Sequence, residues 1–177
     1  MRFAVLMRKQ NIDNPWISYR WIPQEVLPDF GQFNSTADNS ISGKFLERDD
    51  DGESWLFTGY ELNLFPDEAE GYYLNISATT PCWFVMWRLE EDMERYIDSQ
   101  SLPLARSEVT MAVPHRICVS YNEAGRLLDG GESVDTVTMS AEHASWLEEY
   151  VSENYRPEPK KRHRPASFKG AQRTAEE

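Results

Sequence analysis

The chain has 177 residues, of which 40% are hydrophobic and 12% are aromatic, and its formal net charge is −12. This length is enough for one domain that buries roughly two-thirds of the surface exposed in the unfolded chain, and the aromatic content excludes a wholly disordered protein. Because no apolar run is long enough for a secretory signal or a membrane span, we expect a cytoplasmic protein that does not act in a membrane.

The charges are divided unevenly along the chain. Residues 157–177 contain six Lys or Arg and three Glu, which gives +3 and leaves −15 on residues 1–156. We therefore predict a single domain over residues 1–156 and a flexible basic tail over residues 157–177, where prolines prevent further helix. The acidic domain should repel phosphate backbones, so a nucleic acid is disfavoured as its partner.

Two strands are expected near the N-terminus. An apolar run predicts a strand over residues 2–7, and Asn and Pro residues predict a turn over residues 11–15. Alternation then predicts a second strand over residues 16–22, with the side that carries Ile17, Tyr19 and Trp21 toward the core and Pro23 limiting its extension.

A run of three aspartates interrupts the polar segment over residues 29–54. Because Asp49, Asp50 and Asp51 stand next to Gly52 and before an apolar stretch, they predict a turn that leads into a strand. A calcium loop is the alternative, but the run lacks the alternating ligands and the distant bidentate Glu of an EF-hand.

The later elements follow from periodicity and from capping residues. Strands are expected, in chain order, at residues 55–65, 82–89, 115–119 and 133–139. Helices are expected at residues 66–74, 121–129 and 141–154, with a short helical turn at 93–97. Ser120 and Ser140 are the expected N-caps of the last two helices.

Together these elements predict an α+β fold. We expect a mixed or antiparallel sheet of about five to six strands with two to three helices, followed by an extended basic C-terminal tail. The stretch over residues 82–89 is apolar on both alternating faces, so it is the expected central strand.

No catalytic motif is present in the sequence. It contains no nucleophile elbow, phosphate-binding glycine loop, dinucleotide fingerprint or zinc-ligand spacing, and we predict no bound cofactor or metal. An enzyme would therefore need a pocket built from dispersed residues, for which His115, Cys118 and Cys82 are the candidates. The two cysteines form no Cys-x-x-Cys motif and are expected to be reduced core residues.

Three tryptophans are candidates for a binding groove. Trp83, Trp87 and Trp146 lie on apolar faces of their predicted elements and are expected in the core. Exposed aromatic side chains are frequent binding anchors, and the remaining tryptophans are the candidates to line a groove for a peptide: Trp16, Trp21 and Trp55.

Three stretches carry a family resemblance: "FTGYELNLFPDEAEGYYLNIS", "CWFVMWRLEE" and "VSYNEAGRLLDGGESVDTVTMSAEHASWLEEYVSENYRPEPKKRHRPASF". They resemble an uncharacterised bacterial family of small proteins, a domain of unknown function, whose members are often encoded beside molybdenum- or tungsten-dependent formate dehydrogenases. The resemblance covers most of residues 16–168 and implies accessory work beside that enzyme. It brings no catalytic residues with it.

Three functions stay open at this point. The missing catalytic motifs and the resemblance favour a non-enzymatic accessory or assembly protein that binds a protein partner, for which a formate dehydrogenase component is the candidate. The alternatives are a small cofactor-handling protein or enzyme, and a nucleic-acid binder that acts through its tail. In that last case the basic side chains, including Lys169, would contact phosphates while Phe168 stacks on a base.

The basic tail is the expected docking element for a protein partner. Its partner-binding candidates are Lys160, Lys161, Arg162, Arg164 and Phe168. The alternative is that the tail folds back on the acidic side of the last helix, where each exposed ion pair would contribute roughly a few tenths of a kcal/mol. That side carries Glu142, Glu148, Glu149 and Glu153.

Overall fold

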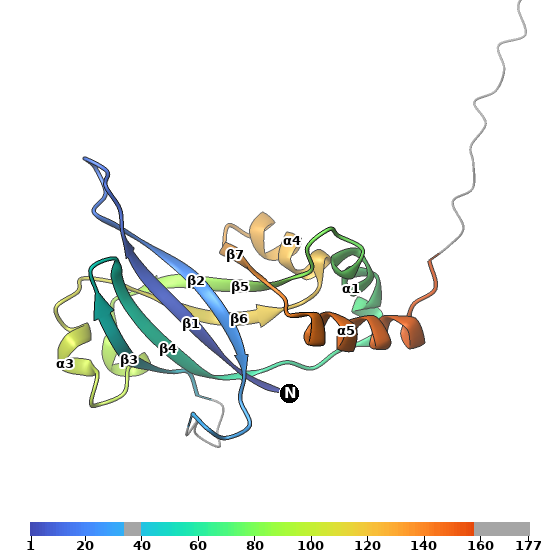
Figure 1. Ribbon diagram of the computed structural model, residues 1–177, viewed down its shortest axis with the longest axis horizontal. Coiled ribbons are helices and arrows are strands. Elements are labelled where there is room, and N and C mark those ends of the chain that lie inside the picture. Colours follow the sequence, from blue (N-terminus) through green and yellow to red (C-terminus); the bar gives the residue numbers. More distant parts are fainter. Residues whose placement is uncertain (34–39, 158–177) are drawn as a thin grey trace, which may run out of the picture.

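The computed structural model describes residues 1–33 and 40–157, which form two antiparallel sheets and several helices (Figure 1). The first sheet has the strand order β2-β1-β4-β3 and the second has the order β6-β5-β7. The strands are β1 (Arg2–Asn11), β2 (Tyr19–Pro28), β3 (Ser42–Asp49), β4 (Gly52–Glu61), β5 (Cys82–Glu90), β6 (Met111–Cys118) and β7 (Ser133–Thr138).

The helices gather at the two ends of the sheets (Figure 1). They are η1, a 3-10 helix (Pro66–Glu68), α1 (Ala69–Ile76), α2 (Met93–Tyr96), α3 (Leu102–Ala105), α4 (Tyr121–Asp129) and α5 (Ala141–Asn154). Helices α1, α4 and α5 lie at one end, and α3 lies near β3 at the other. Among the residues that the structure describes, no helix combines the length and the apolar character needed to cross a bilayer.

The core lies between the two sheets. Strand β2 of the first sheet contacts β7 of the second, and β4 contacts β6, so the sheets face each other. Alternate side chains of β1 and β4, such as Phe3 and Phe57, point inward and are fully buried, as are Val85 of β5 and Val113 of β6. The rings of Phe3 and Trp83 bridge the sheets, with centroids 4.8 Å apart.

The α+β class and the antiparallel pairing are as predicted, but the sheet count is not. The described residues form seven strands in two sheets instead of five to six in one, and five α-helices instead of two to three. Strand β3 escaped prediction because most of its side chains are exposed, which hides the alternation that marks a half-buried strand. Helices α2 and α3 are single turns of four residues each.

Several predicted bounds also need correction. The strand predicted over residues 16–22 begins only at Tyr19, and it continues through Pro23 to Pro28. It does so because β2 is an edge strand that pairs with β1 alone, and an unpaired side tolerates the missing proline N–H. Edge strand β6 likewise contains Pro114 and begins at Met111, earlier than predicted.

Candidate functional site

The three candidate groove tryptophans do not come together. Trp55 and Trp21 are only 1% and 7% exposed, because both face the interior from the first sheet. Side chains buried this deeply offer no surface to a peptide, so the groove prediction is corrected for these two residues. Trp16 is different, since 90% of it is exposed.

Trp16 lies in the loop between β1 and β2, residues 12–18, which we call the hairpin tip. The N–H of Ile12 donates to the carbonyl oxygen of Ser18 at 3.0 Å and closes the base of the loop. The Trp16 N–H donates to Oδ1 of Asn14 at 2.9 Å, a local turn that fixes the backbone beside the indole. The next residue, Ile17, is 57% exposed. The tip therefore presents two large apolar side chains on a hydrogen-bonded loop.

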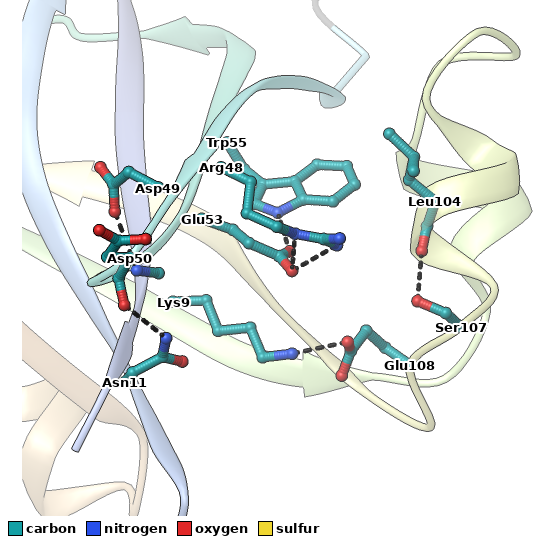
Figure 2. Close-up of polar contacts among 11 residues, drawn as sticks. Lys9, Asn11, Arg48, Asp49, Asp50, Glu53, Trp55, Leu104, Ser107 and Glu108 are labelled. Carbon is teal, nitrogen blue, oxygen red and sulfur yellow. Dashed lines mark hydrogen bonds and ion pairs between the residues drawn. The ribbon is translucent and has the colours of Figure 1, made fainter. Parts of the chain in front are cut away.

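Contacts from three segments hold the strands below the tip (Figure 2). Nζ of Lys9 lies 2.6 Å from Oε1 of Glu108 and 4.2 Å from the centre of the Tyr19 ring. The Asn11 side chain donates to the carbonyl oxygen of Asp50 at 3.2 Å, and its N–H donates to that of Asp51 at 2.8 Å. The end of β1, at the base of the loop, is thus tied to the β3–β4 turn and to the segment that follows α3.

The aspartate run forms the predicted turn, which joins β3 and β4. The Asp49 carboxylate accepts hydrogen bonds from the Arg8 side chain and from the N–H groups of Asp51 and Gly52, at 2.9 and 3.0 Å. The Arg8 hydrogen bond, above all, holds the pKa of Asp49 below its ordinary value. Among the described residues, no cluster of three His, Cys, Asp or Glu side chains is arranged to hold a metal ion.

The hairpin tip and this turn form what we call the hairpin end, and its uncompensated charge is mainly negative. The exposed carboxylates of Asp13, Asp50 and Asp51 have no ion-pair partner within the described residues. Three neighbouring cations are already engaged, in the pairs Arg8 with Asp49, Lys9 with Glu108 and Arg48 with Glu53.

A second feature is a cavity of about 380 Å³ between the end of β4 and β6. His115 lines it at a β-bulge. Pro114 and Arg116 pair with consecutive residues of β5, and His115 between them has no partner on that strand. Its Nε2 lies 2.6 Å from Oε1 of Glu90, and its ring stands edge-on to Tyr96. Sequence reasoning missed Glu90, because no local signal tells which residue of another strand will face the imidazole.

The two cysteines lie elsewhere. Cys118 packs with Phe84 and Ala124 in a small cluster that Cys82 joins, and both thiols are free. Burial raises the pKa of Cys118 to about 12 and also raises that of Cys82. His115 is thus the one member of the predicted trio that lines this cavity, and both thiols are poor nucleophiles.

The predicted tail residues Lys160, Lys161, Arg162, Arg164 and Phe168, and also Lys169, lie outside the described part of the chain. The acidic side of α5 is exposed, as expected. Sequence reasoning also missed Asp13 and Ile17 as parts of one tip. The Asn14-Pro15 pair was the available signal, because a turn there sets both residues outside a strand.

Comparison with known proteins gives one match. No curated protein and no solved structure matched the chain. The model of the family described as "Protein of unknown function (DUF3305)" matches residues 2–164. The match runs through the described residues and into the basic tail. This protein therefore belongs to that family of unknown function.

Proposed function

We propose that this protein is an accessory protein that acts by binding another protein, and that the hairpin tip is one of its docking elements. The exposed Trp16 carries the proposal. Tryptophan is enriched among the interface residues that contribute most to binding, because burying its large surface is strongly favourable. The hydrogen bonds of the loop already fix its backbone, which lowers the entropy that binding must cost.

A formate dehydrogenase component is the partner we propose to test first. The support is the resemblance to proteins often encoded beside such enzymes. In this proposal the basic tail adds a second contact, through Lys160, Lys161, Arg162, Arg164 and Phe168.

The test is recovery of partners by the tagged full-length protein from its native host at moderate salt. We expect Trp16→Ala to weaken recovery by tenfold or more, as is typical of a central aromatic anchor. Phe30→Ala is the matched control, because Phe30 is also an aromatic residue and is 85% exposed. Equal recovery by the Trp16 variant would contradict the role of the tip. Absence of every formate dehydrogenase component would contradict the proposed partner.

The cavity beside His115 supports a second candidate function, a small cofactor-handling protein or enzyme. Its volume of about 380 Å³ is within the range of ligand sites, and Glu90 fixes the orientation of the imidazole as a general base requires. Titration with nucleotides and flavins, followed by NMR of the histidine ring, tests this function. Shifts in the native protein that vanish in Glu90→Gln would support it, and no shift with any compound would count against it.

A further inference from the structure

We propose that the partner of the hairpin tip presents an apolar pocket bordered by lysine or arginine side chains, and that Trp16 inserts into this pocket. The inference rests on the proposed function, because it specifies the surface that the same tip recognises. Its support is the combination of an apolar anchor with unpaired carboxylates whose positions the backbone fixes.

The first step is the position of the acidic groups relative to the anchor. Asp13 belongs to the same loop as Trp16 and stands three residues before it. Asp50 and Asp51 form the two-residue turn between β3 and β4, and their carbonyl oxygens accept hydrogen bonds from Asn11 at the base of the loop. These backbone contacts place carboxylates beside the loop that carries the indole.

The second step is the balance of charge around the tip. Arg8, Lys9 and Arg48 each lie in an ion pair with a carboxylate. Arg20, next to Tyr19 at the start of β2, donates from Nε to Oε1 of Gln10 at 3.0 Å and is in no ion pair within the described chain. Three unpaired carboxylates against one such cation leave a net negative surface, which is complementary to a basic rim.

The third step distinguishes a protein from a lipid surface. A tryptophan at the tip of a loop is also suited to the interface of a bilayer. Insertion there would bring Asp13 and its neighbours against anionic headgroups, which repel carboxylates. The charge of −15 on residues 1–156 adds to that repulsion. A protein pocket with basic residues around it has no such cost.

The fourth step predicts that the indole and the carboxylates affect different rate constants of binding. The indole, once buried, should set mainly how slowly the complex dissociates. Carboxylates at the rim should steer the encounter, so they raise the association rate at low salt and lose this effect when salt screens them. Separate substitutions can therefore separate the two contributions.

The experiment starts from the full-length protein with a photo-crosslinking amino acid at position 17, which leaves Trp16 in place. Irradiation in the native host identifies the protein that touches the tip. That crosslinked protein, purified, is then the probe for association and dissociation rates at low and high salt. Vesicles of anionic and of zwitterionic phospholipid are the parallel probes for a membrane.

Two triple variants separate local charge from net charge. The first, Asp13→Asn with Asp50→Asn and Asp51→Asn, removes three charges at the hairpin end. The second removes three charges from exposed residues of η1, α1 and α4, far from the tip: Asp67→Asn, Glu70→Gln and Asp129→Asn. Circular dichroism confirms that both are folded, and the salt dependence of the unmodified protein is an independent measure of the same attraction.

We expect the hairpin-end variant to associate several-fold more slowly at low salt and at the ordinary rate at high salt, while the helix variant stays near the unmodified rate. Trp16→Ala should weaken binding tenfold or more at both salts. Equal association by both triple variants, together with a weak Trp16 variant, would overturn the basic rim and leave the proposed function standing. An unaffected Trp16 variant, or Trp16-dependent binding to vesicles, would overturn both.

Discussion

Gly52 closes the turn between β3 and β4 in a conformation that other residues rarely adopt. Its φ is +147°, and a Cβ atom placed there would lie 1.9 Å from the carbonyl oxygen of Lys9. Because that oxygen belongs to the backbone of β1, the clash cannot be relieved by rotating a side chain. The close approach of β4 to β1 at the hairpin end therefore requires glycine.

Gly52→Ala should lower the free energy of unfolding by more than about 1 kcal/mol, because it adds both a clash and an unfavourable φ. Gly125→Ala is the control, since Gly125 lies within α4 with no atom near its Cβ position. That change should raise the free energy of unfolding by about 0.5 to 1 kcal/mol. Chemical denaturation followed by circular dichroism measures both. A neutral Gly52 variant would contradict the packing of the turn against β1.

Burial of the two thiols sets their reactivity. Cys118, whose pKa is about 12, should react very slowly with a thiol reagent in the native protein at neutral pH, because the thiolate is the reactive form. Cys82 is half-buried and should react sooner. Mass spectrometry after timed labelling measures both rates, and unfolding in denaturant should make them alike. Rapid native labelling of Cys118 would show that its cluster with Phe84 opens readily.

Alternation predicted the inward side of β2 correctly only within the strand itself, because Ile17, predicted on that inward side, lies in the loop and is 57% exposed. Trp21 does face the core, as its side of the predicted strand required. Trp16 was assigned to the same strand and lies outside it, because the Asn14-Pro15 turn extends to Ser18. A period of two residues is a property of every pair of neighbours along a strand, whereas the point at which pairing begins depends on the partner strand.

At the scale of elements, α4 is held by one buried hydroxyl. Oγ of Ser120 accepts the N–H of Glu123 at 3.1 Å and donates to Oε2 of Glu68 at 2.7 Å. Burial alone would raise the pKa of Glu68, but the hydrogen bonds from Ser120 and Arg126 outweigh it and lower that pKa. Gly71 of α1 allows the close approach, since a Cβ there would meet Oγ of Ser120 at 2.0 Å.

Ser120→Ala should cost about 2 kcal/mol of unfolding free energy or more, because it removes a cap and also a hydrogen bond to a carboxylate. Ser140→Ala removes two contacts in an exposed position at the start of α5: the cap, where Oγ accepts the N–H of His143 at 3.3 Å, and a hydrogen bond between Oγ and Nδ1 of His143 at 2.9 Å. It should cost about 1 kcal/mol. The comparison uses denaturant titration of both variants. A larger loss for Ser140→Ala would contradict the account of the α4 terminus.

Helices with local signals were the most predictable elements. The serine caps marked the residues at which α4 and α5 begin, and the predicted ranges of both helices match the structure. Glu123, three residues after the cap, could return a hydrogen bond to the N–H of Ser120, but its carboxylate instead lies 2.9 Å from Nε of Arg116. A cap depends on residues that are three apart in the chain. A side chain near a sheet can also bind a neighbouring strand, whose position the sequence alone does not predict.

At the scale of the molecule, the sequence could not predict how the two sheets pack against each other. Contacts of β2 with β7 and of β4 with β6 join segments that are far apart in the chain, and nothing in their local patterns specifies those neighbours. The cavity beside His115 depends on the second of these contacts. The sequence identified His115 as a candidate residue, but it could not predict which other residues line the cavity.

The same arrangement separates the hairpin tip from the helix that precedes the tail in the sequence. The hairpin tip and α5 lie at opposite ends of the molecule (Figure 1), and the described chain leaves α5 at Tyr155, whose ring lies 5.1 Å from that of Tyr73 on α1. A partner that contacts both the tip and the end of α5 must therefore span the distance between them. Removing the tail distinguishes its contribution from that of the tip.

Truncation after Arg156 keeps the contact between Tyr155 and Tyr73 and removes a segment of charge +3. We expect an unchanged midpoint of thermal unfolding, because the residues that form the core all remain. Recovery of the partner should fall, and its dependence on salt should become weaker, since the basic side chains of the tail are gone. A mobility-shift assay with nucleic acid belongs to the same experiment, because a tail-mediated nucleic-acid binder would lose that binding too. A truncated protein that keeps every partner would contradict docking through the tail and would leave Trp16 as the element to pursue.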